Sequence, residues 1–184
     1  VDIFAVEASI FYEYNDAKVN AEAQDQDLKF DQFGLHYFGF EELFVSKWPG
    51  GFFGGFSLKG LFHQSDFIYN TKYRLRGFKS AIRYGYKWNI KNKLVLEPSA
   101  LLEYGNLRIK DKANDSKLKN NGLNFGLFGD LRFIIRSHGV IGISAGYLYQ
   151  LTNSKWNKSK NFDSTLSASP MNWNGWYFSL KLGF

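Results

Sequence analysis

The chain has 184 residues and is basic, with 23 Lys and Arg against 17 Asp and Glu, and 19% of its side chains are aromatic. The absence of cysteine excludes a disulfide framework and any thiolate metal or redox site. No run reaches the 18 or so apolar residues of a membrane helix, but a membrane β-strand needs only about ten alternating residues. The composition therefore leaves a β-barrel open, and we expect one domain over residues 1–184, present as a processed mature chain without a cofactor.

Alternation with a period of two predicts eight β-strands. In chain order they lie within residues 2–15, 28–44, 52–65, 77–89, 94–106, 122–136, 141–151 and 173–184. The second strand is ambiguous in register, because residues 33–37 favour one apolar face and residues 38–44 favour the other. A β-bulge near Gly39 would reconcile the two halves.

The connections between these strands alternate in length. Tight turns follow the second, fourth and sixth strands, whereas polar loops follow the first, third, fifth and seventh, at residues 16–27, 66–76, 107–121 and 152–172. An antiparallel barrel in a bilayer has this asymmetry, with short turns on the periplasmic side and long loops outside. The sequence therefore predicts an all-β, closed, antiparallel, eight-stranded up-and-down transmembrane barrel with both termini in the periplasm.

The two faces of the strands differ sharply in charge. In the six strands of clear register the apolar face has no charged residue, whereas the opposite face carries Glu7, Glu13, Lys79, Arg83, Lys87, Glu97, Glu103, Asp130, Arg132, Arg136 and Lys181. A Lys or Arg facing the lipid midplane costs ~2–4 kcal/mol, so the uncharged face is expected to meet lipid. The enclosed charges must pair, for example Glu7, Glu97 and Glu103 with Arg83, Arg132 and Arg136, and we expect them to form a structural plug.

A soluble eight-stranded barrel of the lipocalin kind also alternates and would turn its apolar face inward. Two features favour the membrane barrel. The polar face is rich in Gly, Ala and Ser, which suits a narrow interior just filled by side chains. Aromatic residues also gather at both ends of the apolar face, as two interfacial girdles would. The expected outer girdle is Tyr12, Tyr14, Tyr104, Tyr147, Tyr149 and Trp176, and the expected inner girdle is Tyr84, Tyr86, Trp88 and Phe184.

The last strand, WNGWYFSLKLGF, places apolar residues at every second position up to an aromatic last residue. This ending resembles the C-terminal signal strand of outer-membrane barrels, and the whole chain resembles the small barrels of the OmpA/OmpX/Ail type. The resemblance implies a bacterial outer-membrane location and a monomer with a closed polar interior, in a group linked to adhesion, resistance to host defence and envelope stability. It also implies that the assembly machinery reads Phe178, Leu180, Leu182 and Phe184.

The positive charge is concentrated in the second, third and fourth loops, which hold eleven bases against four acids. These bases are Lys72, Arg74, Arg76, Arg108, Lys110, Lys112, Lys117, Lys119, Lys155, Lys158 and Lys160. A basic collar at the outer rim could neutralise the phosphates of lipopolysaccharide, and the alternative is a set of solvated, irregular loops. We expect contact with outer-membrane lipid and lipopolysaccharide, and no nucleic-acid binding, since the aromatic residues lie on the lipid face.

Two further functions stay open beside a non-enzymatic envelope or surface protein. One is a narrow channel for small or amphipathic solutes. The other is a lipid A-modifying enzyme, because residues 63–66 (HQSD) resemble the His-x-Ser element of lipid A 3-O-deacylases. Asp66 replaces the expected Asn, the element lies early in the chain, and His63 falls on the lumen face. We therefore expect no enzymatic activity, and neither His36 nor His138 belongs to a metal-binding set.

Overall fold

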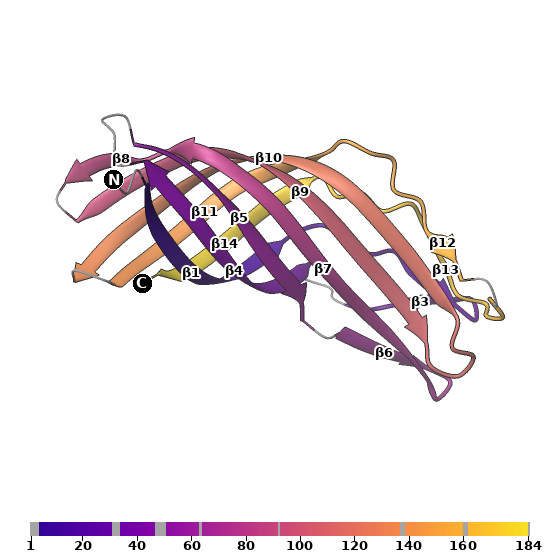
Figure 1. Ribbon diagram of the computed structural model, residues 1–184. Coiled ribbons are helices and arrows are strands. Elements are labelled where there is room, and N and C mark those ends of the chain that lie inside the picture. The colour runs from indigo at the N-terminus through magenta and orange to yellow at the C-terminus, as the bar shows by residue number, and fades with distance from the viewer. Residues whose placement is uncertain are drawn as a thin grey trace.

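Eight long antiparallel strands form a closed barrel in the computed structural model (Figure 1). The structure describes residues 4–30, 34–46, 51–62, 64–91, 93–136, 139–159 and 162–183. In barrel order the strands are β1 (Phe4–Asn15), β4 (Leu35–Ser46), β5 (Phe52–Leu61), β7 (Thr71–Tyr86), β9 (Leu94–Asp111), β10 (Lys117–Arg136), β11 (Gly139–Gln150) and β14 (Gly175–Gly183). Pairing of β14 with β1 closes the sheet, so the predicted eight-stranded barrel is confirmed. In the described part of the chain, no helix has the length and apolar character to cross a membrane.

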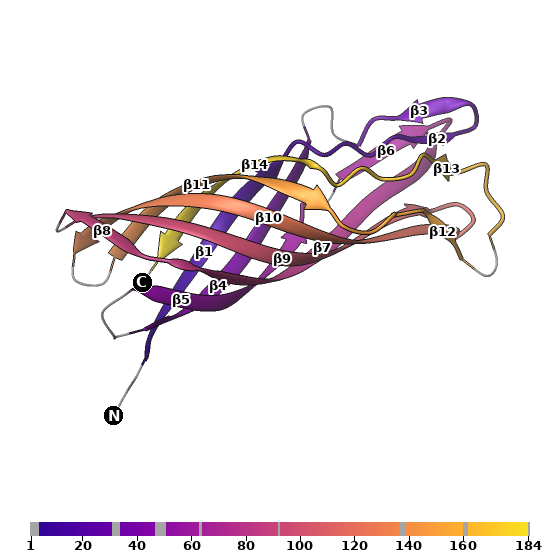
Figure 2. The same ribbon diagram turned by 90° about the horizontal axis from the view of Figure 1, so that it is seen from above.

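Six shorter strands complete the fold. They are β2 (Ala21–Ala23), β3 (Gln26–Leu28), β6 (Gln64–Ile68), β8 (Trp88–Lys91), β12 (Asn157–Lys158) and β13 (Ser167–Ala168). Strand β8 pairs with β9 at the end where β1 begins and β14 ends. The other five gather at the opposite end, where β2, β3 and β13 form a separate sheet, β6 pairs with β7 and β12 pairs with β10 (Figure 2).

Two of the segments predicted as polar loops, residues 66–76 and 107–121, are largely β-structure, so the prediction is wrong there. Residues 16–27 include the short β2–β3 hairpin, and the described part of residues 152–172 is mainly irregular, as predicted. Strands β9 and β10 are so long that only residues 112–116 turn between them. The β2–β3 and β6–β7 hairpins turn at Gln24–Asp25 and Tyr69–Asn70, where all four residues have φ between 45° and 65°. Two consecutive left-handed residues give the twist that suits a two-residue hairpin. Such turns usually contain glycine, and without it the sequence does not mark them.

The apolar side of the longest strands changes along the barrel, as β9 shows. Near the middle of β9, Leu102 faces outward and is 44% exposed, and most inward residues there are polar, namely Glu97, Ser99 and Glu103, with Leu101 among them. Farther out, Leu107 and Ile109 point inward and are fully buried, and Arg108 is exposed on the outer side. Strand β7 changes in the same way. A reversal within one regular strand indicates that the surroundings change from hydrocarbon to water, just beyond Tyr104.

Strand β4 passes through the same reversal, which explains its ambiguous register. Its pairing with β1 and β5 is continuous from Tyr37 to Val45, so the bulge predicted near Gly39 is wrong. Tyr37 is buried inside beyond the reversal, whereas Phe38 is 53% exposed on the outer wall. Gly39 itself faces inward, where an added Cβ would lie 2.5 Å from the ring of Phe11.

The correct register of β4 places one carboxyl on the outer wall. Glu42 lies directly opposite Ala8 on β1 and Phe56 on β5, and it is partly exposed. Its neighbours along the outward face of β4 are Phe40 and Phe44. A Glu facing lipid costs less than the ~2–4 kcal/mol of an Arg or Lys at the midplane, so the barrel can tolerate it.

The outer part of the lumen is filled by an apolar core. Its fully buried members from the long strands are Leu35, Tyr37, Tyr73, Leu75, Leu107, Ile109 and Leu118. The hairpins and the segment before β14 add Leu28, Phe30, Ile68, Leu166 and Met171. This core explains why β7, β9 and β10 stay regular beyond the lipid-facing wall, because their inward side chains are buried against one another.

Trp173 lies in this core and is fully buried. An added Cβ at Gly105 or Gly122 would come within 2.9 or 2.6 Å of its indole, so the ring fits only because both residues are glycine. The indole Nε1 donates to Asn120 Oδ1 and Ser154 Oγ, each at 3.0 Å. Trp173 therefore closes the lumen on its outer side. Its ring is fully packed, and its N–H is hydrogen-bonded.

Aromatic side chains cover the outer wall at two heights. On the outer side, Tyr147 packs edge-on against Trp176 with ring centroids 5.4 Å apart. On the other side, Phe52 packs edge-on against Tyr86 at 5.1 Å, and Tyr86 in turn contacts Trp88. These two belts bound the apolar wall as membrane-interface girdles do. Phe184, expected in the inner girdle, lies outside the described residues.

Candidate functional site

Ion pairs fill the middle of the lumen, and we call this set the lumen network. Its described members are six acids and six bases: Glu7, Glu13, Glu41, Glu97, Glu103, Asp130, Lys59, Lys79, Arg83, Lys87, Arg132 and Lys181. All of these side chains except Glu7 and Lys87 are at most 8% exposed. Equal numbers of opposite charges make their burial tolerable, because each ion has a partner.

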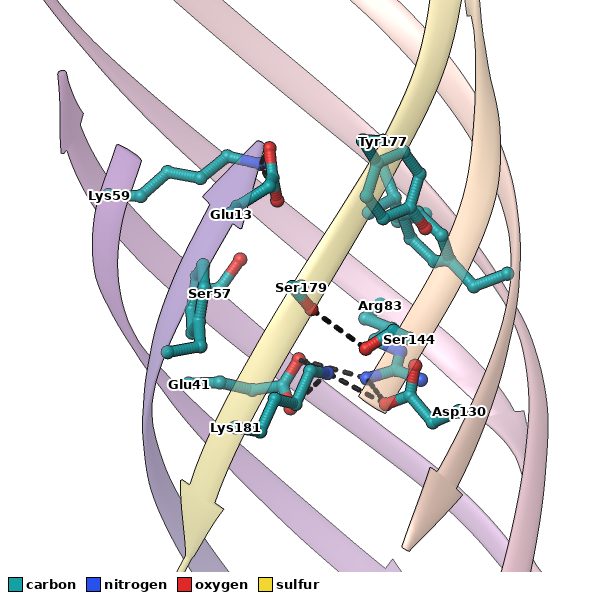
Figure 3. A pocket seen from close by; sticks show the side chains of 13 residues that line it. Glu13, Glu41, Ser57, Lys59, Arg83, Asp130, Ser144, Tyr177, Ser179 and Lys181 are labelled. Carbon is teal, nitrogen blue, oxygen red and sulfur yellow. Dashed lines mark hydrogen bonds and ion pairs between the residues drawn. The ribbon is translucent and has the colours of Figure 1, made fainter. Parts of the chain in front are cut away.

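The inner group of the network is centred on two carboxylates. Arg83 Nη1 lies 2.9 Å from both Glu41 Oε2 and Asp130 Oδ2. Lys181 Nζ lies 3.0 Å from Glu41 Oε1 and 2.7 Å from Asp130 Oδ2. Arg132 Nη2 adds a third contact to Glu41 at 3.2 Å. Figure 3 shows Glu41, Lys181, Arg83 and Asp130 converging from different walls of the barrel.

The outer group of the network pairs lysines with glutamates. Lys59 Nζ lies 2.6 Å from both Glu13 Oε1 and Glu103 Oε2, and Lys79 Nζ lies 2.9 Å from Glu103 Oε1. Lys79 is also 5.2 Å from the ring of Trp173, so this group lies directly beneath the apolar core. The predicted pairing of Glu103 with an arginine is therefore wrong.

Other predicted partners do meet. Arg132 Nε lies 2.8 Å from Glu97 Oε2, and Arg132 Nη1 lies 3.3 Å from Glu7 Oε2. Nothing is described of the Arg136 side chain. The sequence pattern did not reveal Glu41 or Lys59, because the charged lumen positions come from the six strands of clear register, and β4 and β5 are not among them.

A cavity of about 30 Å³ separates the two groups and has room for about two water molecules. Ser57, Tyr177 and the hydrogen-bonded pair Ser144 and Ser179 line it (Figure 3). A cavity of this size holds no organic solute. The lumen network is therefore suited to filling and stabilising the barrel rather than to binding a ligand.

The predicted loop bases gather instead on the outside of β7, β9 and β10, beyond the reversal of the apolar face. We call six of them the basic wall: Arg74, Arg76, Arg108, Lys110, Lys117 and Lys119. They form two rows of directly opposed residues across the three strands. The outer row is Arg74–Lys110–Lys117 and the inner row is Arg76–Arg108–Lys119. Directly opposed like charges destabilise a sheet, so this arrangement calls for a counter-charge.

The outer row already has one counter-charge in the protein. Asp115 forms ion pairs with Lys110 and, at 3.3 Å, with Lys117. Hydrogen bonds from these two lysines lower the pKa of Asp115 below its usual value. The neighbouring charges of Arg74 and Lys110 lower the pKa of Lys112, as expected where cations crowd together.

The other predicted bases surround the wall. Lys112 adjoins Lys72, to whose carbonyl oxygen its backbone N–H donates at 3.0 Å. Lys155 and Lys158 are exposed on the segment beside β10, and Lys158 Nζ lies 4.7 Å from the ring of Phe162. Lys160 lies outside the described residues. The structure thus brings most of the predicted bases together on one wall rather than in a collar around the rim.

The residues of the lipid A-deacylase resemblance do not form a described site. His63 and His138 lie outside the described residues. Ser65 is exposed on β6, and Asp66 Oδ2 accepts the backbone N–H of Lys29 at 2.6 Å. His36 Nδ1 is hydrogen-bonded to the Tyr12 hydroxyl on the outer wall. Among the described residues, no group of three or more His, Asp or Glu side chains is arranged to hold a metal ion.

The predicted assembly signal forms an outward stripe on β14. Phe178, Leu180 and Leu182 are about half exposed, at 52%, 50% and 48%. Phe184 lies outside the described residues. The stripe therefore belongs to the apolar outer wall, on a strand that pairs with both β1 and β11.

A closed eight-stranded barrel with an apolar outer wall, two aromatic girdles and a neutralised polar lumen is the fold of the small outer-membrane β-barrels. The predicted resemblance to the OmpA/OmpX/Ail type is confirmed at the level of the fold by solved structures. No family model matches the sequence, and no curated protein matches it significantly.

Three solved structures illustrate the likeness. The major outer membrane protein of Thermus thermophilus has a TM-score of 0.61 at 10% identity, over 97% of both chains. Ail, the attachment invasion locus protein of Yersinia pestis, in complex with the heparin analogue sucrose octasulfate, has a TM-score of 0.52 at 14% identity, over 97% of this chain and 99% of Ail. The outer membrane protein OprG of Pseudomonas aeruginosa has a TM-score of 0.52 at 11% identity, over 98% of this chain and 93% of OprG.

Proposed function

We propose that this protein is a non-enzymatic, monomeric outer-membrane barrel that binds the phosphate groups of lipopolysaccharide with its basic wall. The inner row, Arg76–Arg108–Lys119, is the observation that carries the proposal. These three cations are directly opposed on adjacent strands, and no acid among the described residues pairs with them. A phosphate in front of this row would relieve their repulsion and accept charge-assisted hydrogen bonds.

The rows beneath the basic wall follow the order of groups in a phosphorylated glycolipid. Next toward the membrane come Asn106 and Asn121, whose side-chain amides are hydrogen-bonded at 2.5 Å. Ser80 and Tyr104 come next, and both line an apolar groove of about 260 Å³ together with Leu102. The wall thus passes from cations, through a row of two amides beside Phe78, to an apolar groove that carries two hydroxyls. That order suits phosphates, amide-linked sugars and acyl chains.

The shared fold adds support of a different kind. The structure of Ail that resembles this chain contains a sulfated ligand, the heparin analogue sucrose octasulfate. Anion binding is therefore compatible with a barrel of this architecture. In this chain the basic wall is the described surface with the charge for such a ligand. A soluble sulfated polysaccharide is the alternative occupant of the same wall.

The proposal also fixes an orientation. Because the basic wall faces the outer leaflet, the start of β1 and the end of β14 lie on the periplasmic side (Figure 1). The outward stripe of β14 is then available to the assembly machinery during insertion. The channel alternative has less support, since ion pairs, a cavity of about 30 Å³ and Trp173 occupy the described lumen.

Binding to lipopolysaccharide tests the proposal. The purified barrel in nanodiscs is titrated with lipid A and with dephosphorylated lipid A, and the triple variant R76Q/R108Q/K119Q is titrated in parallel. We expect the triple variant to bind lipid A at least tenfold more weakly, about 1.4 kcal/mol, because three phosphate contacts are lost. We also expect affinity for dephosphorylated lipid A to be low in both proteins.

The matched control is K18Q/K29Q/K155Q, which removes three exposed lysines outside the basic wall. It should bind lipid A like the wild type, because general charge attraction is screened by salt. Equal binding by both triple variants would contradict the proposal. Preference for a sulfated polysaccharide over lipid A would assign the wall to the alternative occupant.

A further inference from the structure

A second candidate site lies at the far outer end, apart from the basic wall. It is a polar pocket of about 560 Å³, within the size range of small-ligand sites. Four separate parts of the chain line it: the β2–β3 turn, the start of β7, the β9–β10 turn, and Lys158 with residues 162–165. A pocket built from four segments depends on how those segments are held together.

Hydrogen bonds fix these segments to one another. Asp111 Oδ2 accepts from the Ser164 hydroxyl at 2.6 Å, and Asp111 Oδ1 accepts from the Ala113 N–H at 2.8 Å. The backbone N–H of Gln24 donates to Thr165 Oγ1 at 2.9 Å. Asp111 is 2% exposed, so its hydrogen bonds stabilise the wall of the pocket and are not directed at a ligand. The pocket is therefore preformed, which lowers the entropy cost of binding.

Three other polar side-chain groups in the lining do not link the segments to one another among the described contacts. These are the Thr71 hydroxyl, the Asn114 amide and the Asp163 carboxylate, and Asn114 and Asp163 are both exposed. Together they offer a hydroxyl, an amide with both donors and an acceptor, and a carboxylate acceptor. Burial and the nearby Asp111 raise the pKa of Tyr73, whose phenol also lines the pocket, so it remains neutral.

The chemistry of the lining narrows the class of ligand. Two carboxylates against one ammonium group, that of Lys158, disfavour a polyanion. A lining that is mainly polar disfavours an acyl chain. Paired donors and acceptors next to the ring of Phe162 suit a ligand with many neutral hydroxyls and an apolar face of C–H groups.

We propose that this outer pocket binds a neutral saccharide of one or two sugar units, with Asn114 and Asp163 as hydrogen-bonding residues. The site shares no residue with the basic wall, so the inference goes beyond the phosphate binding proposed above and does not depend on it. Two sources have the same chemistry, namely the cell's own surface polysaccharide and the glycans of another cell.

Titration with defined sugars tests the proposal. The full chain is purified in a zwitterionic detergent without a sugar headgroup, and saturation-transfer NMR is recorded with neutral hexoses, deoxyhexoses, N-acetylhexosamines and their disaccharides. We expect saturable binding of at least one of these sugars. We expect Asn114→Ala and Asp163→Ala each to weaken it at least fivefold. No saturable binding across the panel would overturn the proposal.

Matched controls separate the pocket from general effects. Asn153→Ala and Asp27→Ala remove an exposed amide and an exposed carboxylate elsewhere at the outer end, and should bind the sugar like the wild type. If they weaken binding as much as the pocket variants do, the site is elsewhere and the proposal fails. The R76Q/R108Q/K119Q variant should retain sugar binding even if lipid A binding is lost. Competition by purified surface polysaccharide against glycans of other origin then identifies the source.

Discussion

At the scale of single residues, the lumen network shows how buried charges depend on one another. Glu103 has no exposed side-chain surface and contacts both Lys59 and Lys79. Lys79 is equally buried, and Glu103 is the carboxylate with which it forms its described ion pair. Removal of one carboxylate would therefore leave a lysine in the lumen without a counter-ion, which costs more than the pair itself contributes.

We expect Glu103→Ala to lower the free energy of unfolding by about 3–5 kcal/mol, the range for breaking a buried pair. Urea-induced unfolding in lipid vesicles, followed by tryptophan fluorescence, measures the change. Glu22→Ala is the control, because Glu22 is exposed on β2 and should alter stability by less than about 0.5 kcal/mol. A loss below about 1 kcal/mol for Glu103→Ala would mean that Lys79 finds another partner or water.

At the scale of elements, β7, β9 and β10 each belong to two environments. Their inner halves turn apolar residues outward to lipid, and their outer halves turn apolar residues inward to the core beside Trp173. The basic wall occupies the outward positions that this reversal leaves in water. The short β9–β10 turn lowers the net positive charge of the basic wall, because Asp115 within that turn forms ion pairs with Lys110 and Lys117.

We expect Asp115→Asn to strengthen anion binding severalfold at neutral pH, because it releases Lys110 and Lys117. The pKa of Asp115 is lowered from 3.8, so the carboxylate is ionised at neutral pH and becomes protonated only below that value. The difference between variant and wild type should therefore persist as the pH falls to 3.8 and vanish below the lowered pKa. Calorimetry with sucrose octasulfate measures it, since sulfate stays ionised over this range.

A control for this prediction is Asp27→Asn, which makes the same chemical change on β3, away from the wall. It should leave the affinity for the sulfated sugar unchanged. If Asp115→Asn weakens binding at neutral pH, the carboxylate supports the site rather than masking it, and the assignment of Lys110 and Lys117 to the anion site fails.

At the scale of the whole molecule, a closed barrel has three surroundings: hydrocarbon, water and its own lumen. The apolar wall between the girdles is assigned to hydrocarbon because large apolar residues there are exposed, including Leu127 at 51% and Ile143 at 53%. The basic wall is assigned to water. This division predicts the environment of any outward position from its height on the barrel.

Spin labels test that division directly, and the absence of native cysteine allows labelling at a single introduced site. In vesicles, labels at Leu127→Cys and Ile143→Cys should collide with oxygen, which dissolves in lipid, and be protected from a water-soluble nickel complex. A label at Lys119→Cys should show the reverse. Exposure of the Leu127 and Ile143 labels to the nickel complex, or a monodisperse protein in buffer without surfactant, would contradict the membrane assignment.

The sequence by itself determined the eight strands of the barrel and the two faces of most of them, because alternation with a period of two is local. It also showed that one face lacks charge, which indicates lipid. It failed where the surroundings change within one strand. The pattern of β4 predicts a bulge near Gly39 that the structure lacks, and the polar composition of residues 107–121 predicts a loop where β9 and β10 continue.

Only the tertiary structure decided which residues meet. Ion pairs in the lumen join side chains on different strands, so that Glu103 meets Lys79 rather than an arginine, and no local pattern encodes that distance. The basic wall likewise exists because the pairing of β7, β9 and β10 places Arg76, Arg108 and Lys119 in one row. Charges far apart in sequence form a site only once strand pairing and closure of the barrel fix their positions.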